Sequence, residues 1–347
     1  MAPVKSNKND KNIKSSARFS VAPMMDWTDR HCRYFHRLMT SNALLYTEMI
    51  TSAALIRGNA VHLLDYNIAE QPLALQLGGS DPRELSEAAR LGEDRGYTEV
   101  NLNIGCPSSR VKAGSFGAVL MEQPKLVAEC ITEMRKAVSI DITVKCRIGV
   151  DNQSPEDTLP YFLSEIQEAG VDKVTIHARK ALLDGLSPKQ NRNIPPLDYE
   201  IVSKMKKKFD DLHISINGGI STLASAISLI NTDFDGVMVG RAAYNSPWEI
   251  LPNVDQTIYN AVPKLITRFD IIMRMMPYIR NHLMNGGKVH QVTRHMIGLF
   301  NGEKNARKWR QTLSQEGVLP YADETILLKA YENMMAATEV ETIADVA

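Results

Sequence analysis

The sequence lacks a long apolar run, a zinc-ligand pattern and an excess of charge of either sign. No stretch approaches the ~20 apolar residues of a membrane helix, and the first eighteen residues contain no apolar block of the signal-peptide type. The four cysteines form no CxxC and no His/Cys pairing at zinc-ligand intervals; they are Cys32, Cys106, Cys130 and Cys146. We therefore expect a cytoplasmic protein with reduced thiols, no membrane contact and no metal site.

The charge and composition describe an ordinary globular chain. Forty basic and forty acidic residues cancel, which argues against a general polycation but can conceal a local basic patch. Hydrophobic residues make up 44% and charged residues 23% of the chain, so there is material for a large core. The Lys-, Asn- and Ser-rich residues 1–18 are predicted to be a disordered tail.

From residue 19 onward, short apolar runs alternate with longer stretches of helical period, a pattern typical of repeated β-α units and a parallel sheet. Eight such units are the number in a closed (β/α)8 barrel, whereas a doubly wound nucleotide-binding fold has fewer strands and an early glycine-rich turn. We therefore predict an α/β fold with a TIM barrel over residues 19–252. The eight runs are 19–23, 44–48, 72–77, 99–103, 141–147, 173–177, 213–217 and 236–239.

Polar residues alternate with apolar ones inside the predicted strands. Thr143, Lys145 and Arg147 share one face of their strand, which we expect to line the barrel. In this fold the chemistry lies at the C-terminal ends of the strands. Other polar residues at such ends are Gln76, Asn103, His177 and Asn217.

Beyond Leu251 the strand pattern stops, and helices are predicted at 263–284, 291–299, 306–315 and 323–336. We predict that residues 253–347 form a separate all-helical domain. The segment 288–310 carries six basic residues and one acid, Glu303, so that a basic stripe lies within a neutral total.

Two glycine-bearing loops follow the last two predicted strands, and each leads into a helix. They are Asn217-Gly218-Gly219 and Gly240-Arg241. We predict a phosphate site at these two loops, because they combine bare backbone amides, a helix N-terminus and a cation. Either loop alone could be a plain turn. Lys145 and His177 fit contacts to a phosphate-bearing cofactor; the alternatives are a lysine extended to the rim and a structural histidine.

The segment 101–107, Asn-Leu-Asn-Ile-Gly-Cys-Pro, gives the sharpest local signal. A strand delivers Asn103 to the barrel mouth, and Gly105 and Pro107 hold the Cys106 thiol in a turn above it. Such a thiol can act as a general acid or, once ionised, as a nucleophile.

These residues closely resemble the tRNA-dihydrouridine synthases, and specifically their A-type members. The resemblance covers the chain from residue 19 to the last helices. The motifs that carry it are 21–30, 75–79, 101–107, 144–149, 176–180, 215–219 and 237–241, with the A-type markers at 116–118, 178–180 and 185–192.

The resemblance implies a flavoprotein that reduces D-loop uridines of tRNA, of the U20/U20a type, to 5,6-dihydrouridine with FMN and NADPH. Reduced FMN would give a hydride to C6, and Cys106 would give the proton to C5. The implied FMN contacts are Pro23, Met24, Met25, Gln76, Lys145, His177, Asn217, Gly218, Gly219, Gly240 and Arg241.

The substrate contacts that we predict divide between the barrel and the helical domain. Asn103 would hold the uracil ring, while Arg307 and Arg310, three apart on one helix, would grip phosphates beside Lys308 and Trp309. Further predicted contacts are Arg179, Lys189, Asn191, Arg192 and Arg294. We predict no stable protein partner.

Two other functions are compatible with parts of this pattern. An FMN barrel oxidoreductase acting on a free pyrimidine, like dihydroorotate dehydrogenase, would also need an acid or base above the flavin, but it has no use for a basic helical domain. A tRNA-binding chaperone with a vestigial flavin site would have no use for the set Lys145, His177, Arg241 and Cys106.

Overall fold

The structure is a computed structural model that describes residues 17–108, 111 and 114–344. The predicted disordered tail, residues 1–18, lies outside the described residues except for its last two. The chain divides into two compact units. The first unit contains the chain up to Asp26 together with Asn42–Gly240, and the second contains Trp27–Ser41 together with the chain from Arg241 onward.

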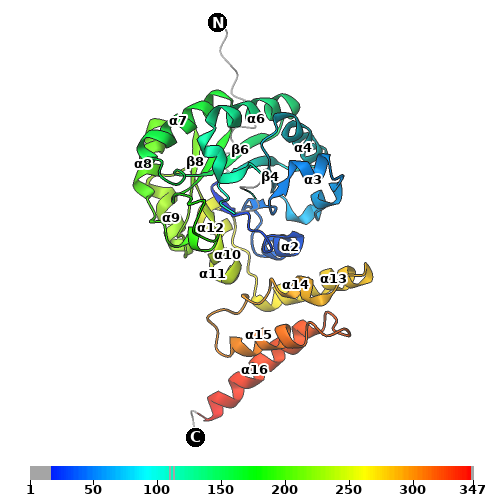
Figure 1. Ribbon diagram of the computed structural model, residues 1–347. Coiled ribbons are helices and arrows are strands. Elements are labelled where there is room, and N and C mark those ends of the chain that lie inside the picture. The colour runs from blue at the N-terminus through cyan, green and yellow to red at the C-terminus, as the bar shows by residue number, and fades with distance from the viewer. Residues whose placement is uncertain (1–16, 109–110, 112–113, 345–347) are drawn as a thin grey trace. The chain divides into compact units, whose positions relative to one another are not determined.

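The first unit is built on one parallel sheet that curls into a barrel (Figure 1). The described strands follow the order β1-β9-β8-β7-β6-β5-β4-β2, and β3 pairs with β4 beside this path. A parallel bridge between Ser20 and Leu44 joins the two ends of the order. The strands are β1 (Phe19–Val21), β2 (Leu45–Tyr46), β3 (Ile50–Thr51), β4 (Leu73–Gly78), β5 (Glu99–Ile104), β6 (Asp141–Arg147), β7 (Lys173–His177), β8 (His213–Asn217) and β9 (Gly236–Val239).

Helices of the first unit lie around the outside of the sheet, as Figure 1 shows for α4, α6, α7 and α8. Local capping fixes where several of them begin: Asp81 accepts the backbone N–H groups of Arg83 and Glu84 ahead of α4. The helices are α3 (Ser52–Ile56), α4 (Pro82–Asp94), α6 (Pro124–Ala137), α7 (Pro155–Glu168), α8 (Tyr199–Lys208) and α9 (Leu223–Thr232), with 3-10 turns η1 (Val61–Leu64), η2 (Ile68–Glu70), η3 (Gly117–Glu122) and η4 (Gln190–Arg192). The predicted (β/α)8 barrel is confirmed.

The two faces of strand β6 differ as predicted: one is apolar and the other lines the barrel interior. Ile142, Val144 and Cys146 of β6 are fully buried among apolar neighbours. Thr143 and Lys145, on the other face of β6, hydrogen-bond to side chains of other strands across the barrel interior. The interior is therefore a polar core enclosed by an apolar shell.

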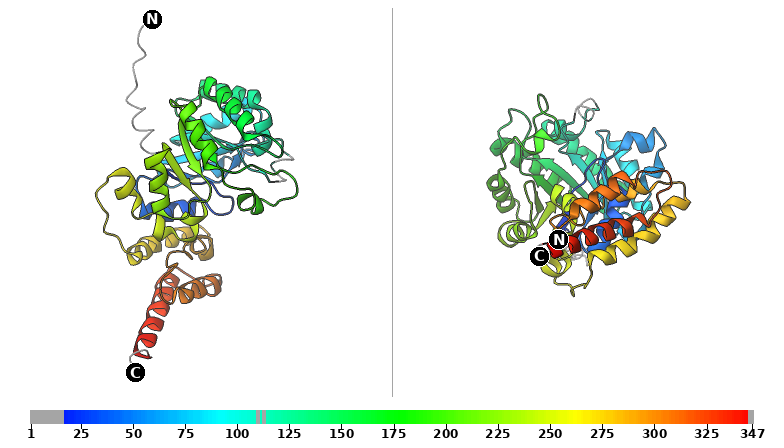
Figure 2. Two further views of the ribbon diagram at one scale, coloured as in Figure 1. Left: turned by 90° about the vertical axis from the view of Figure 1, so that its left-hand side faces the viewer. Right: turned by 90° about the horizontal axis from the view of Figure 1, so that it is seen from below.

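The described residues of the second unit form helices joined by turns and irregular segments, with no strand among them. Figure 2 shows α15 and α16 side by side, in agreement with their extensive packing. No helix among the described residues is both long and apolar enough to cross a membrane. The helices are α2 (Arg30–Met39), α10 (Arg241–Asn245), α11 (Pro247–Ile250), α12 (Val254–Tyr259), α13 (Arg268–Met284), α14 (Val289–Thr293), α15 (Ala306–Gln315) and α16 (Ile326–Ala344).

Three predicted helices in this unit have other bounds in the structure. The helix predicted over 323–336 is α16, Ile326–Ala344, and for the other two the reason is identifiable. The helix predicted from residue 263 begins only at Arg268, because Thr267 and Asp270 form a reciprocal capping box there. The helix predicted over 291–299 is instead α14, which ends at Thr293 and is followed by turns. Gly298 lies in that turn region, where an added Cβ would come within 2.4 Å of the carbonyl oxygen of Asn245.

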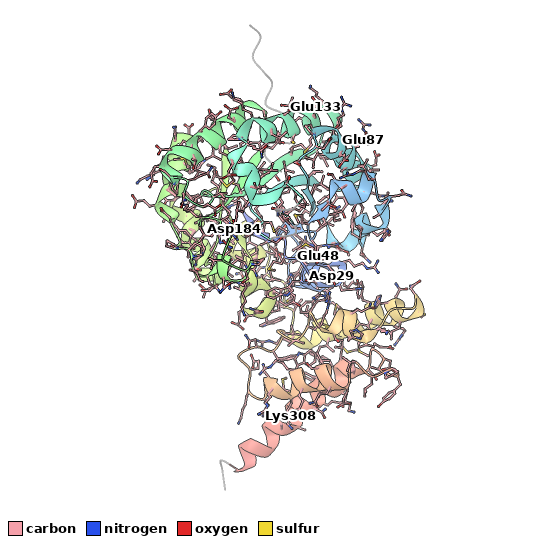
Figure 3. All side chains as sticks on the ribbon, viewed as in Figure 1. Asp29, Glu48, Glu87, Glu133, Asp184 and Lys308 are labelled. Carbon is pink, nitrogen blue, oxygen red and sulfur yellow. The ribbon has the colours of Figure 1, made fainter. Side chains whose placement is uncertain are left out.

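Helix α2 belongs to this unit because two carboxylates, one partly exposed and one buried, hold its ends. At its start Asp29 accepts the N–H groups of His31 and Cys32 and pairs with Arg294 at 2.6 Å (Figure 3 labels Asp29). At its end Asp255 of α12 accepts from the Thr40 hydroxyl and from the Ser41 N–H, both at 2.6 Å.

Candidate active site

The strand register places three polar side chains at one level of the barrel. Arg147, His177 and Asn217 are successive partners across β6, β7 and β8, each at the last position of its strand. Because the C-terminal ends of parallel strands meet at one rim of a barrel, the three residues line the same mouth. Lys145, one inward-facing position deeper on β6, donates to the Asn217 side chain at 3.2 Å.

The segment after β5 holds Cys106 through its backbone. The side-chain oxygen of Asn103 accepts the N–H groups of Gly105 and Cys106 at 3.1 and 3.0 Å. The carbonyl of Cys106 accepts the N–H of Ala118 at 3.0 Å. The thiol is half-buried, and its nearest described polar partner is the Ser108 hydroxyl at 3.6 Å.

Gly117 lets this loop close. Its φ is +74°, which favours glycine, and an added Cβ would lie 2.7 Å from the carbonyl oxygen of Cys106 and 2.3 Å from Val111. A larger residue at this position would push Cys106 out of its present place.

Arg147 is the functional residue that sequence reasoning missed. Its guanidinium is buried and donates to three carbonyl oxygens from separate segments, those of Gly105, Lys180 and Asn191. It thereby ties the Cys106 loop to the loop after β7. The alternation in β6 predicted an inward direction for Arg147, but no sequence signal indicated the carbonyls it would meet.

The mouth carries more positive than negative charge. Burial, and then Arg147, lower the pKa of Lys145 to about 8. Burial, followed by the charges of Arg147 and Lys145, holds the pKa of His177 well below its usual range, so this imidazole is neutral at pH 7. Among the described residues, the charged groups that shift the pKa values of Lys145 and His177 most are cations and thiols. The cations include Arg179 and Arg192. An anionic ligand would offset this excess.

The Gly218-Gly219 loop lies against His177. Gly218 has φ +110°, and a Cβ there would meet the His177 ring at 2.7 Å; Gly219 has φ +70°, and its Cβ would meet Leu197 at 2.4 Å. The Tyr199 hydroxyl donates to the Gly218 carbonyl. Both positions favour glycine, so bare backbone directly follows β8, ahead of the capping Thr222 of α9.

The remaining predicted cofactor residues of the first unit follow β1 and β9 at the same mouth. Pro23 and Met24 follow β1 and are partly exposed, and Met25 is 53% exposed. Gly240 follows β9, with an added Cβ 3.7 Å from the Met24 sulfur. Arg241, the next residue in the chain, begins α10 of the second unit.

Gln76 and Asn103, two of the predicted ligand contacts, already hydrogen-bond to other residues within the barrel. Gln76 is 1% exposed, donating to Asn101 at 2.8 Å and accepting from Asn103 at 2.9 Å. Asn103 holds the Cys106 loop as described, so any contact with a uracil ring would use its second amide hydrogen.

The loop after β7 has cations on its surface, and a buried asparagine holds its conformation by hydrogen bonds. Lys189 and Arg192 are exposed. Asn191 is fully buried, and its side chain bonds to both backbone groups of Leu182. Asn191 therefore shapes the loop and offers no surface to an RNA. The guanidinium of Arg179 donates to the carbonyls of Asn193 and Pro195.

In the second unit, Arg294 and Arg310 line one cavity of about 480 Å³ with Tyr244, Asn245, His295 and Asn301. Arg307 and Lys308 are exposed on α15. Trp309 is buried, donates to the Met296 carbonyl at 3.0 Å and packs against Phe300, so its predicted place beside a phosphate is wrong.

Asp29 controls the charge next to this cavity. Its burial would raise the pKa of its carboxyl, but the hydrogen bond and charge of His295, together with the Cys32 N–H and Arg294, hold that pKa far below its usual value. Asp29 is therefore an anion across the physiological range, and part of the positive charge of Arg294 is neutralised.

Comparison with known proteins gives a consistent result. The family model described as "Dihydrouridine synthase (Dus)" matches residues 20–334. A curated relative from Shewanella oneidensis, named tRNA-dihydrouridine(20/20a) synthase, is 50% identical over 332 residues, covering 95% of this chain and 98% of the relative. Relatives of the same name from Vibrio vulnificus and Synechocystis are 51% and 50% identical, covering 91% and 90% of this chain and 96% and 93% of their own.

Solved structures with low identity share the fold. A 2-naphthoyl-CoA reductase in complex with 2-naphthoyl-CoA aligns with a TM-score of 0.52 at 12% identity, covering 70% of this chain and 51% of its own. The structure of TcOYE with pHBA aligns with a TM-score of 0.50 at 10% identity, covering 73% and 92%.

Proposed function

Because the chain belongs to the dihydrouridine synthase family, we propose that it reduces D-loop uridines of tRNA, at positions of the 20 and 20a type, to 5,6-dihydrouridine in the cytoplasm. FMN is the proposed cofactor and NADPH the proposed electron donor. The observation that supports this most directly is the Cys106 thiol, held by its own backbone beside a cation-rich barrel mouth.

The residues of the mouth fit a flavin with a phosphate. Gly218 and Gly219 have no room for a Cβ, so this loop offers bare backbone. Burial and then Arg147 lower the pKa of Lys145 to about 8, and burial and then Arg192 and Arg179 lower the pKa of Arg147 to about 10. A bound anion would offset the repulsion among these cations. We propose that the phosphate is held by Asn217, Gly218, Gly219, Gly240 and Arg241, and that Pro23, Met24, Met25, Gln76, Lys145 and His177 border the ring and ribityl chain.

The chain's own residues have three tasks in the reaction. Bound FMN, once reduced by NADPH, would supply the hydride for C6 of the uracil. Cys106 Sγ gives its proton to C5 from the opposite face of the base. Arg147 holds the Cys106 loop through the Gly105 carbonyl, and Asn103 keeps the thiol over the mouth through two backbone N–H groups.

The proposed substrate surface carries cations outside the barrel mouth. Arg294, Arg307, Lys308 and Arg310 of the second unit, with Arg179, Lys189 and Arg192 of the barrel, are proposed to bind tRNA phosphates. A free pyrimidine would need none of these residues, and the cavity that joins Arg294 to Arg310 favours a polyanionic substrate. The target base must leave its stack, which costs less in a loop than in a helix.

The proposal is tested by replacing the acid alone. Cys106→Ala should retain FMN and its reduction by NADPH, but flavin reoxidation by excess tRNA should slow by about a hundredfold or more, the usual size of general acid catalysis. The measurement is single-turnover reoxidation at the flavin absorbance band, together with dihydrouridine formed in bulk tRNA. Cys130→Ala, which removes a fully buried thiol on α6, is the matched control. A wild-type protein that purifies without flavin, or makes no dihydrouridine, would refute the function.

A further inference from the structure

A single chain of hydrogen bonds runs through the barrel interior from its base to the Cys106 loop. It begins at Glu99, whose carboxylate is paired with Lys173 at 2.6 Å, both side chains being at most 5% exposed. It ends at the two backbone N–H groups of the loop. The links are Thr143 Oγ1 to Glu99 at 2.5 Å, Asn101 Nδ2 to Thr143 at 2.8 Å, Gln76 Nε2 to Asn101 at 2.8 Å, Asn103 Nδ2 to Gln76 at 2.9 Å, and the N–H groups of Gly105 and Cys106 to Asn103 Oδ1 at 3.1 and 3.0 Å.

The carboxylate sets the direction of every link. A carboxylate only accepts, so the Thr143 hydroxyl must donate to Glu99 and can receive only from the Asn101 amide group. The Asn101 oxygen then faces Gln76, and the same reasoning orients Gln76 and Asn103 in turn. The oxygen of Asn103 is thereby left facing the loop, where it accepts from Gly105 and Cys106.

Burial makes this direction hard to reverse. Asn101 and Thr143 are fully buried and Gln76 is 1% exposed, so no bulk water can satisfy an amide that turns over. Reversal of Asn103 would set its NH2 group against two backbone N–H groups. The sheet register favours the present arrangement, because Gln76 and Thr143 are the strand partners of Asn101 on either side.

We propose that Glu99 and Thr143 are positioning residues for Cys106: through the amides of Asn101, Gln76 and Asn103 they fix the orientation that holds the thiol in place. The consequence for catalysis rests on the proposed role of Cys106 as the proton donor, whereas the effect on the loop does not. Neither Glu99 nor Thr143 is assigned a contact with cofactor or substrate.

Thr143→Val is the sharpest test, because it removes the hydroxyl and keeps the shape. Glu99 remains satisfied by Lys173 and by the Tyr46 hydroxyl at 2.6 Å, so the ion pair survives. With nothing to receive its NH2 group, Asn101 is held only from the Gln76 side, and Gln76 and Asn103 are in turn held only by the two loop N–H groups, so the orientation of all three amides is less firmly fixed. Amide hydrogen exchange at Gly105 and Cys106, measured on the protein as purified, should accelerate by about threefold to tenfold, as expected for one lost neutral hydrogen bond.

Alkylation of Cys106 by iodoacetamide gives a second readout, since the other three cysteines are buried. The rate should rise in Thr143→Val by a similar factor and return to the wild-type value in Thr143→Ser. Ser215→Ala is the matched control: it removes a buried hydroxyl, 3.1 Å from His213, from the same interior but outside the chain. It should change neither rate at the Cys106 loop.

Unchanged exchange and alkylation in folded Thr143→Val would overturn the proposal, and so would an equal acceleration in Ser215→Ala. If Thr143→Val does not fold, Asn101→Leu breaks the next link and must give the same two accelerations for the proposal to stand. Flavin reoxidation by tRNA should slow in Thr143→Val while its reduction by NADPH does not. A wild-type protein inactive on tRNA would refute the proposed function. The positioning role of Glu99 and Thr143 would then be tested by hydrogen exchange and alkylation at the Cys106 loop alone.

Discussion

Asp141→Asn should make the protein more stable at pH 8 and have little effect near pH 4. Asp141 opens β6 and is 8% exposed. Burial, and then the charges of Asp172 and Glu99, raise the pKa of its carboxyl from 3.8 to about 7, which Lys173 only partly offsets. Asparagine has the shape of the protonated acid at every pH.

The sign follows from which state binds the proton more tightly. Between pH 4 and 7 folded Asp141 binds a proton that the unfolded chain has released, so the wild-type protein loses stability as pH rises through that window. The full shift of about three pKa units corresponds to an upper limit of about 4 kcal/mol. Because the group is not fully shielded from water, we expect about half of this free energy, roughly 2 kcal/mol, which corresponds to a rise of about 3 °C in Tm at pH 8.

The assay is thermal unfolding followed by circular dichroism at pH 8 and pH 4.5, where the gain should shrink to about a quarter. Glu87→Gln is the control, because Glu87 points outward from α4 (Figure 3) and should have no effect at either pH. An Asp141→Asn variant that is less stable than wild type at pH 8, or that gains equally at both pH values, would refute the reasoning.

Two further predictions concern the ligands. The double variant Lys145→Ala, Arg241→Ala should purify colourless, since it removes the cations proposed at the ring and phosphate of FMN; full flavin absorbance would move the site elsewhere. Arg307→Ala with Arg310→Ala should weaken tRNA binding and reduce the slope of log affinity against log salt by roughly 0.7 to 0.9 per lost phosphate contact. The exposed pair Lys207→Ala, Lys208→Ala of α8 is its control, and an unchanged slope in the arginine variant would exclude α15 from the RNA surface.

The strands of the barrel were predictable because the sequence pattern of a strand lies within the strand itself. The bounds predicted for β6, β7, β8 and β9 agree with the structure to the residue, since a buried parallel strand is a short apolar run between turns. Strand β3 was missed because Ile50–Thr51 is too short to carry a period. The presence of polar residues at strand ends was equally predictable, and so was the turn that holds Cys106.

What the polar side chains bond to was not predictable, because it depends on cross-strand register. Arg147 reaches carbonyls 33 to 44 residues away in sequence, and the order of donors from Glu99 to Asn103 exists only once β4, β5 and β6 are paired. Trp309 illustrates the converse: its basic neighbours suggested an RNA surface, but an aromatic residue within an amphipathic helix packs inward.

The bonds that hold the two ends of α2 to residues far along the chain have a consequence for synthesis on the ribosome. Thr40, which caps its end, bonds to Asp255, 215 residues later, and Asp29, which caps its start, bonds to His295, 266 residues later. At about 5–20 residues per second, α2 waits roughly 10 to 50 seconds after emerging before its partners exist. During that wait the buried face of α2 has no permanent cover, so the nascent chain depends on transient protection there. For the same reason a fragment beginning at Arg241 would be an incomplete unit, and a recombinant helical domain should include residues 27–41.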